Sequence, residues 1–512
     1  MSSHSFTEIS NNNWQVAIAG AGAGKTRGMI DDAIKEIDNL WPNRFMTIIT
    51  YTNAATDEIS SRLNKRMDIP NNLFIGTIHG FLNRFVLSPY AKILNISTSN
   101  IIYVDSVKLN YECKGGNKIY KERNAKISLA DRLINSGIVQ HDKSIEIAYK
   151  ITRNPVIKAA IANRLQYVFI DEYQDSTILQ HEIFISILNE GKTKFYFTGD
   201  PEQYIYSFRY GANSMIRKEP KPNNLLEIPL VVLSKEGEKR KLLKKSTDNK
   251  RSSSKVVCFL NNFNKQVQQN AEYDGPEVEY INLHDIDELI KKYLSECDRH
   301  SIGKEKKFLL SRNWNTIEGV ALKNSFMPLS NEGALNTNKL LSISLGFISA
   351  IAGKSIKQIK DETGQDIISL RKLGLDIIRH VKANNKITID DVKKLICDRL
   401  HVKLEDIIDS EGMLDKLKNI YHSPKNDKNC YYSTVHSAKG LEADSVLVIA
   451  KTKNELSRWL EKGEANRIAD KGDQCRVGFV GFSRARKLLC LACLEKIEDI
   501  ESQMKELSIV VV

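Results

Sequence analysis

The feature that most constrains the fold is a glycine-rich loop between an apolar stretch and a helical pattern. Residues 14–18 form the short apolar stretch, and a helical pattern runs from Arg27 to Leu40. A strand, a glycine-rich loop and a helix in this order are the setting of a phosphate-binding loop. We therefore expect a nucleotide site in this loop, which consists of Ala19, Gly20, Ala21, Gly22, Ala23, Gly24, Lys25 and Thr26.

The residue types of this loop suit a polyphosphate. Glycines let successive backbone N–H groups approach a phosphate, because a Cβ would block the approach or forbid the dihedral angles. Lys25 would neutralise the β- and γ-phosphate oxygens, and the Thr26 hydroxyl would bind Mg²⁺. The first position is Ala19 rather than glycine. A chance Gly-Ala turn is the alternative, and the flanking strand and helix argue against it.

Two adjacent acids supply the second half of this site. Asp171 and Glu172 directly follow the apolar run of residues 167–170. A carboxylate at a strand end beside the phosphate loop can hold Mg²⁺, and its neighbour can orient and deprotonate water. Adjacent acids are commonly only solvated, but this position after a buried strand favours catalysis.

Strand and helix patterns alternate along the chain, which predicts an α/β fold with parallel sheets. We expect two cores, each interrupted by a mainly helical insertion. The expected segments are 1–85 with 165–225 for the first core and its ATP site, 86–164 for its insertion, 226–320 with 428–512 for the second core, and 321–427 for a reduced insertion of the second core.

Composition narrows the class of partner. The formal net charge is +12 over 512 residues, and a basic excess favours a polyanion such as nucleic acid. Eight scattered cysteines exclude a secreted disulfide scaffold. No apolar run is long enough to cross a bilayer and the first residues are polar, so we expect a cytoplasmic protein without a membrane partner. The lysine-rich stretch 235–251 is either a DNA-facing loop or a solvated linker.

From Asp171 to Asp175 the sequence D-E-Y-Q-D resembles the second motif of superfamily 1 helicases of the UvrD/Rep/PcrA type. Further segments resemble the other motifs in the family's order. They are residues 19–26, 50–55, 76–81, 199–209, 251–253, 311–313, 434–442 and 479–486. The resemblance implies two RecA-like cores and a DNA-dependent ATPase that moves 3′ to 5′ along single-stranded DNA, with ATP and Mg²⁺ as cofactors.

The resemblance also implies roles for single residues. Asp171 and Glu172 would serve catalysis as argued above, and Gln203 would sense the γ-phosphate. Arg251 and Arg484 would reach the γ-phosphate from the second core and stabilise charge on it. Further residues implied at the nucleotide are Arg27, Arg209, Gly440 and Glu442.

A second set would lie on single-stranded DNA. Tyr51, Tyr206 and Phe208 match positions where the family stacks bases, with core packing as the alternative for such aromatics. The polar residues implied at the DNA are Thr52, Asn53, His79 and His436. For the two histidines, a structural hydrogen bond is the alternative.

The chain differs from the family in the residues that would recognise the adenine base. No upstream glutamine that reads adenine is evident, because Gln15 lies too close to the loop. Lys250 stands where a stacking tyrosine is usual. We therefore expect relaxed nucleotide preference, unless Arg27 or Trp14 restores the contact with the base.

Size and layout resemble the helicase-like subunit of a Gabija-type anti-phage system, which works with a separate nuclease subunit. The tail after Cys493 is too short for a fused nuclease domain. Three functions compete: a helicase or translocase, a DNA-sensing ATPase that activates a partner nuclease without processive unwinding, and a phosphate-loop enzyme unrelated to nucleic acid. The third and fifth motifs argue against the last.

Overall fold

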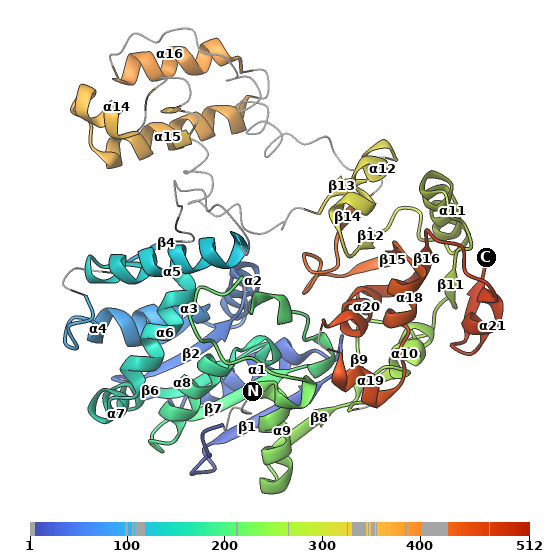
Figure 1. Cartoon of the computed structure of the whole chain (residues 1–512), viewed down its shortest axis with the longest axis horizontal. Helices are drawn as coiled ribbons and strands as arrows, with labels where there is room; N and C mark the ends of the chain where they lie inside the picture. Colours follow the sequence, from blue (N-terminus) through green and yellow to red (C-terminus); the bar gives the residue numbers. More distant parts are fainter. Residues whose placement is uncertain are drawn as a thin grey trace. The chain divides into compact units, whose positions relative to one another are not determined.

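The computed structural model of the chain (Figure 1) describes residues 6–97, 101–104, 107, 118–210, 213–264, 266–324, 326–329, 345–346, 348–349, 354, 356–384, 387–400, 429–470 and 472–512. The chain divides into two compact units. The larger comprises Met1–Leu329 and Lys428–Val512, and the smaller is Ser330–Asp427.

The first sheet of the larger unit has six parallel strands in the order β3-β2-β6-β7-β1-β8. Its strands are β1 (Trp14–Ala19), β2 (Phe45–Thr50), β3 (Leu73–Thr77), β6 (Leu165–Ile170), β7 (Lys194–Gly199) and β8 (Leu243–Ser246). β1 pairs with β7 on one side and with β8 on the other. The carboxyl ends of these strands therefore meet at one edge, where ligands bind in open α/β sheets.

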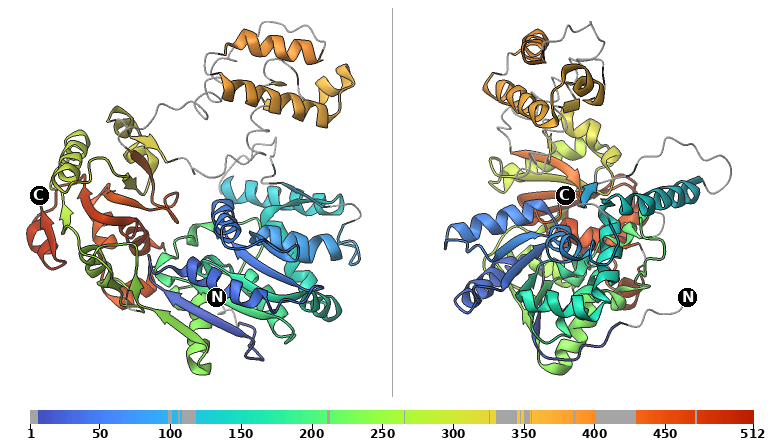
Figure 2. Two further views of the ribbon diagram at one scale, coloured as in Figure 1. Left: turned by 180° about the vertical axis from the view of Figure 1, so that it is seen from behind. Right: turned by 90° about the vertical axis from the view of Figure 1, so that its left-hand side faces the viewer.

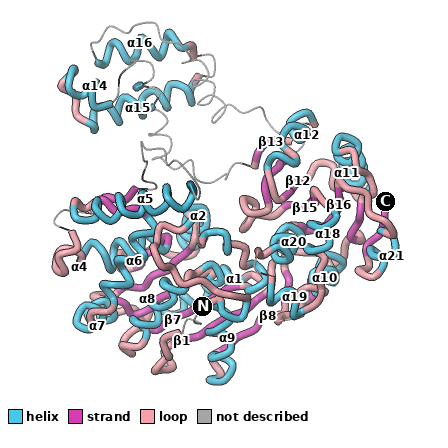
Figure 3. The backbone as a smooth tube through the Cα atoms, in the orientation of Figure 1, coloured by secondary structure: helices cyan, strands magenta, loops and turns pink. Residues whose placement is uncertain are grey.

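Helices cover both faces of this sheet, as Figures 1 and 3 show. They include α1 (Lys25–Ile37), α2 (Asn53–Asn64), α3 (Ile78–Leu82), α4 (Ser88–Tyr90), α7 (Pro155–Arg164), α8 (Ile178–Leu188) and α9 (Pro229–Arg240), with a π-helical turn at Asn83–Leu87. On one face α1 and α2 pack on Ile48 and Phe169. On the other, α8 and α9 pack on Val16 and Phe197. Burial on both faces explains why the strands are continuous apolar runs.

A mainly helical insertion lies between β3 and β6. It contains α5 (Lys118–Asn135), α6 (His141–Thr152) and a short parallel pair of strands, β4 (Ile102–Val104) and β5 (Ile138–Gln140). α6 packs against α8 through the same hydrophobic cluster that covers the first sheet.

The second sheet has seven parallel strands in the order β13-β14-β12-β15-β16-β11-β17. Its strands are β11 (Val278–Tyr280), β12 (Lys307–Ser311), β13 (Met327–Pro328), β14 (Cys430–Thr434), β15 (Ala443–Ala450), β16 (Ala485–Cys493) and β17 (Ile509–Val511). A separate two-stranded pair is formed by β9 (Asp248–Asn249) and β10 (Asn270–Ala271). The left view of Figure 2 shows the two large sheets as separate groups of strands.

Helices also cover this sheet on both faces. They are α10 (Ser254–Asn261), α11 (Ile286–Arg299), α12 (Glu318–Lys323), α18 (Lys453–Trp459), α19 (Glu464–Ala469), α20 (Gln474–Phe482) and α21 (Ile500–Lys505). One hydrophobic cluster joins Phe259 and Phe479 to Val446. The other joins Leu289 to Leu447. The expected fold class, α/β with two parallel-sheet cores, is confirmed.

One segment differs from the sequence-based layout. We expect residues 226–246 in the second core, whereas α9 packs on the first sheet and β8 is one of its strands. β8 is a lysine-containing strand at the sheet edge, so it lacks the apolar run of a central strand. The stretch 235–251 contains the end of α9, β8 and β9 with short connections between them, rather than one continuous loop or linker. The segment after Cys493 forms α21 and β17, and β17 extends the second sheet.

The smaller unit contains α14 (Ile356–Thr363), α15 (Ile367–Ala383) and α16 (Ile389–Leu400). Ile377, Val392 and Ile396 belong to its own hydrophobic core. Residues 401–427 of the expected insertion lie outside the described residues. Among the helices that the structure describes, none combines the length and apolarity required to cross a membrane.

Candidate active site

The glycine-rich loop joins β1 to α1 at the carboxyl edge of the first sheet. Gly22 and Gly24 both have a φ of +78°, a left-handed conformation that residues with a Cβ rarely adopt. The Lys25 ammonium donates to the carbonyl oxygens of Ala19 at 3.1 Å and Gly20 at 3.2 Å. The loop therefore curves around the lysine, with α1 beginning at its end. This is the geometry of an anion site at a helix N-terminus.

Asp171 and Glu172 follow β6 beside this loop. The Thr26 hydroxyl donates to the Asp171 carboxylate at 2.6 Å. Burial and the adjacent Glu172 charge raise the pKa of Asp171 to about 6. Burial also acts on Glu172, but the charges of Lys25 and Lys439 outweigh it and lower the pKa of Glu172. The two carboxyls are therefore pushed apart in acidity, as in pairs with divided acid and base roles.

The same residues fit a magnesium ion. Carboxylate and hydroxyl oxygens are the ligands that Mg²⁺ prefers, and Thr26 and Asp171 bring one of each into contact. The raised pKa of Asp171 records the cost of its buried negative charge. A divalent cation would offset that cost.

Gln203 connects this site to the second sheet. Its amide nitrogen donates to Asp200 at 2.7 Å, and its amide oxygen accepts from the guanidinium of Arg484 at 3.0 Å. The Asp200 carboxylate lies 4.0 Å from the Lys25 ammonium. Polar contacts therefore run without a break from the loop of the first sheet to Arg484, which follows α20. Burial and the charge of Arg251 lower the pKa of Arg484 to about 9.

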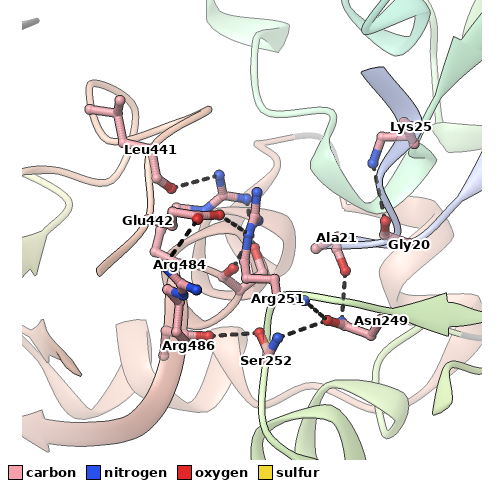
Figure 4. Close-up of polar contacts among 12 residues, drawn as sticks. Gly20, Ala21, Lys25, Asn249, Arg251, Ser252, Leu441, Glu442, Arg484 and Arg486 are labelled. Carbon is pink, nitrogen blue, oxygen red and sulfur yellow. Dashed lines mark hydrogen bonds and ion pairs between the residues drawn. The ribbon is translucent and has the colours of Figure 1, made fainter. Parts of the chain in front are cut away.

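Figure 4 shows a second group of charged residues near the loop. The Arg251 guanidinium forms an ion pair with Glu442 at 2.5 Å and donates to the carbonyl oxygen of Ser483 at 3.3 Å. Arg486 lies 3.8 Å from the other Glu442 oxygen. Gly440 precedes this acid with a φ of +86°. The structure thus brings Arg251, Arg484 and Glu442 together.

The segment that carries Arg251 packs directly on the glycine-rich loop. The Asn249 amide donates to the carbonyl oxygen of Ala21 at 2.8 Å, as drawn in Figure 4, and Lys250 N–H donates to Gly22 at 3.0 Å. A Cβ on Gly22 would lie 2.6 Å from the Asn249 side chain. A Cβ on Gly20 would lie 2.4 Å from the Gln269 amide. The glycines are therefore needed for this close approach as well as for phosphate.

Sequence reasoning did not single out Asn249 and Gln269, and it also left Lys439 without a role. The Lys439 ammonium contacts both oxygens of Asp175, at 2.8 and 2.6 Å, and the carbonyl oxygen of Gln203 at 2.9 Å. Both partners of this ion pair are buried. Lys439 and Asp175 both lie in segments that resemble family motifs, which could have indicated a role for each. Their pairing could not be predicted, because it depends on how the two sheets face each other.

Two further arginines are expected at the nucleotide, and their surroundings differ from those of Arg251 and Arg484. Arg209 donates to the carbonyl oxygen of Asp175 at 2.8 Å, and its guanidinium lies 4.7 Å from the centre of the Tyr206 ring. Arg27 is exposed in the first turn of α1. Trp14, an alternative contact for the base, is fully buried. Its indole donates to Asn11, so Trp14 cannot meet a nucleotide.

The aromatic residues after β7 differ in what their rings can contact. The Phe208 ring is 54% exposed, and His436 packs edge-on against it with centroids 5.5 Å apart. The Tyr206 ring is half-buried, with the cations of Arg209 and Lys439 each 4.7 Å from its centre. More than half of the Phe208 surface is therefore open to solvent, whereas two cations lie beside the Tyr206 ring.

The other residues expected at the DNA follow β2 and β3. The Tyr51 hydroxyl bonds Ser176 and burial raises its pKa. Thr52 caps α2 by accepting from Ala55 N–H at 3.1 Å, and Asn53 beside it is exposed. Burial and the neighbouring His141 lower the pKa of His79 to about 4, and burial also lowers the pKa of His436. In both histidines burial thus disfavours the charged imidazolium.

A cavity of about 310 Å³ adjoins the glycine-rich loop between α1 and β8. Open space surrounds Gly24 and Gly28 on the side where a Cβ would lie. The polar residues in its lining include Gln15, Asp32 and Ser246. Lys250, by contrast, is half-exposed with its ammonium 3.9 Å from Glu272.

Comparisons with known proteins agree with this geometry. The family model of the UvrD/REP helicase N-terminal domain matches residues 5–145 and 109–224. The Gabija protein GajB of Bacillus cereus (strain VD045) is 25% identical over 96% of this chain and 95% of that protein.

Rep helicases match over shorter segments. The ATP-dependent DNA helicase Rep of Escherichia coli (strain K12) is 23% identical over 56% of this chain and 47% of its own length. The Rep protein of Buchnera aphidicola subsp. Baizongia pistaciae is 26% identical over 38% of this chain and 34% of its own length. The chain thus covers half or less of these two Rep proteins. Together the matches support a DNA helicase or ATPase activity.

Proposed function

Because the chain is a relative of the UvrD-type superfamily 1 helicases, we propose that it is a DNA-dependent ATPase that moves 3′ to 5′ along single-stranded DNA. ATP is the expected nucleotide, with Mg²⁺ held by Thr26 and Asp171. Glu172 acts as the base that orients and deprotonates water. Lys25, Arg251 and Arg484 stabilise charge on the phosphates.

The observation that carries this proposal is the line of contacts Lys25–Asp200–Gln203–Arg484. It joins the two sheets at the point where the triphosphate would lie. A nucleotide in this position would contact both halves at once, so binding and hydrolysis would change how the halves meet. Such a coupled change is what movement along DNA requires.

Phe208 supplies the DNA side of the proposal. Its exposed ring follows Gln203 by five residues in the same loop, and base stacking on an aromatic ring is independent of sequence. One loop thus carries both the proposed phosphate sensor and the proposed base contact.

The test is ATP hydrolysis with and without single-stranded DNA, followed by displacement of streptavidin from biotin at either DNA end. We expect DNA to stimulate hydrolysis, and displacement only from the 5′ end, which a 3′-to-5′ motor reaches last. Unstimulated hydrolysis would refute DNA dependence. Displacement from the 3′ end would refute the direction.

A second candidate function is a DNA-sensing ATPase that activates a partner nuclease without processive unwinding. The near full-length similarity to a Gabija protein favours it, as does the Gabija-type resemblance drawn from the sequence. A strand-displacement assay on a tailed duplex separates the two, because only the first function releases the paired strand. Co-purification with a separate nuclease whose activity depends on this chain would support the sensing role.

A further inference from the structure

The loop of residues 200–209, here called the Gln203 loop, contacts the second half of the larger unit through Lys439 and Arg484 at Gln203, and through three further residues on either side of it. The Glu202 carboxylate pairs with Arg467 of α19. The carbonyl oxygen of Tyr204 accepts from Arg476 of α20 at 3.0 Å. The backbone N–H of Ser207 donates to Asp473 at 2.8 Å.

These three holding residues are themselves joined to one another. The Arg476 guanidinium donates to Asp473 at 2.6 Å and to the carbonyl oxygen of Arg467 at 2.9 Å. Each of the three is at most 2% exposed. Separating either charge pair, Arg476 from Asp473 or Arg467 from Glu202, would leave a buried charge without its partner, which is strongly unfavourable.

The group of Arg467, Asp473 and Arg476 lies close in the chain to Arg484, which itself contacts the Gln203 loop. Arg476 lies in α20, and Arg484 follows the end of the same helix. Gln203 bonds Arg484 at 3.0 Å, while Phe208 lies one residue beyond the held Ser207. Among the described residues, no polar contact joins Arg467 or Arg476 to Lys25, Thr26, Asp171 or Glu172. Arg467 and Arg476 therefore reach the site through the Gln203 loop and, for Arg476, also through the helix that leads to Arg484.

We propose that Arg467, together with Arg476 and Asp473, positions the Gln203 loop so that it moves with the second half. Because these contacts fix the loop on both sides of Gln203, a base that binds Phe208 shifts the position of Gln203 relative to the triphosphate. The inference rests on the proposed function and adds the residues that couple DNA contact to hydrolysis. It assigns Arg467 a positioning role and no contact with the nucleotide.

The main test replaces the buried ion pair by an apolar pair of similar volume, Glu202→Leu with Arg467→Met. Such exchanges commonly keep or raise stability because no charge remains buried. The exchange removes the directional bond between residues 202 and 467. If the pair only stabilises the fold, DNA stimulation should persist; if the pair positions the loop, DNA stimulation should fall. The matched control makes the same change at the exposed pair Lys255–Glu277, as Glu277→Leu with Lys255→Met.

For the buried exchange we expect the thermal midpoint to stay near that of the unchanged protein. The ratio of kcat with and without single-stranded DNA should fall about tenfold, within the range of coupling between linked sites. The Kd for ATP and the basal kcat should change by less than about twofold. The control exchange should leave the ratio intact. Normal DNA stimulation in the buried exchange would overturn the proposal.

A second variant guards against misfolding of the first. Asp473→Asn keeps an oxygen that can accept from Ser207, and asparagine tolerates the φ of +54° at this position. It loses the charge that holds Arg476, so the DNA-stimulated ratio should fall while basal hydrolysis persists. An unchanged ratio here would also overturn the proposal. If the unchanged protein shows hydrolysis without any DNA stimulation, the proposed function fails first and the coupling role fails with it.

Discussion

Gln203 and Arg484 lie 281 positions apart in the chain, yet the amide oxygen of one accepts a hydrogen bond of 3.0 Å from the guanidinium of the other. Gln203 follows β7 of the first sheet, and Arg484 precedes β16 of the second. This bond makes the proposed phosphate sensor depend on both halves. The predictions below test what each half contributes.

Lys25→Ala should abolish ATP binding and hydrolysis, whereas Glu172→Gln should bind ATP and not turn it over. Lys25 alone gathers the loop around its ammonium, while Glu172 is the carboxylate kept ionised by Lys25 and Lys439. Loss of one such group should reduce kcat by at least about a hundredfold. ATP binding by calorimetry and turnover by phosphate release separate the two effects. The exposed Lys35→Ala on the same helix is the control, and equal loss of binding in both site variants would contradict this division.

Arg484→Ala should reduce hydrolysis by about a thousandfold while affinity for ATP stays within a few-fold. The guanidinium approaches Gln203 from the opposite half, so it should act mainly when both halves contact the nucleotide. Single-turnover hydrolysis and ATP binding measure the two quantities. Arg458→Ala, an exposed arginine of α18, is the control. Near-normal DNA-stimulated turnover in Arg484→Ala would exclude the role.

Phe208→Ala should weaken binding of single-stranded DNA about tenfold, which corresponds to one lost stacking contact. Basal hydrolysis should change little, because Phe208 is exposed, whereas Gln203 is buried among its polar contacts. Fluorescence anisotropy with labelled oligonucleotides gives the affinity. Trp41→Ala removes a similarly exposed aromatic from the loop between α1 and β2 and should have no effect. Unchanged DNA affinity together with reduced basal hydrolysis would mean that Phe208 serves packing.

Hydrolysis of GTP should proceed at a rate comparable to that of ATP. Lys250 stands where a stacking aromatic is usual, and it is half-exposed beside Glu272. Trp14 is buried and cannot replace it. Discrimination between bases depends on polar groups that the wrong base leaves unpaired, and the sequence shows no glutamine at the upstream position where the family reads adenine. We expect Lys250→Tyr to tighten ATP binding selectively. A preference for ATP in kcat/KM above about a hundredfold, or ~2.7 kcal/mol, would refute this prediction.

Binding of Mg²⁺ with nucleotide should weaken as the pH falls through about 6, the raised pKa of Asp171. Below that pH the carboxyl is protonated and loses its charge, so it no longer attracts the cation. Since burial and then the Glu172 charge raise this pKa, Glu172→Gln should move the transition to a lower pH. Magnesium titration of ATP binding, rather than hydrolysis, isolates this effect from loss of the base. An unmoved transition would show that another group titrates.

The raised pKa of Asp171 also determines how its contribution to the stability of the fold changes with pH. A folded-state pKa above the unfolded value means that Asp171 favours folding most below the unfolded pKa. This contribution is lost as the pH rises through about 6. The site therefore holds a charge that burial opposes at neutral pH, as expected where function rather than stability selects the group.

Local patterns in the sequence were sufficient for the α/β class, the parallel strands and the glycine-rich loop. Strand and helix formation depends largely on residues close together in the chain. The spacing of apolar residues therefore predicts these elements. The order of motifs likewise indicated Gln203, Arg251 and Arg484 before any contact between them was known. The fold class and the loop needed only residue types and their spacing, whereas the roles of Gln203, Arg251 and Arg484 came from the resemblance to the helicase family.

Tertiary structure alone decided which residues meet. It placed β8 in the first sheet, Asn249 and Gln269 on the glycine-rich loop, and cations around Tyr206. It also paired Glu202 with Arg467 across 265 positions. No local pattern encodes such contacts, because they depend on the path of the chain between distant segments and on charges that become costly only when both partners are buried together.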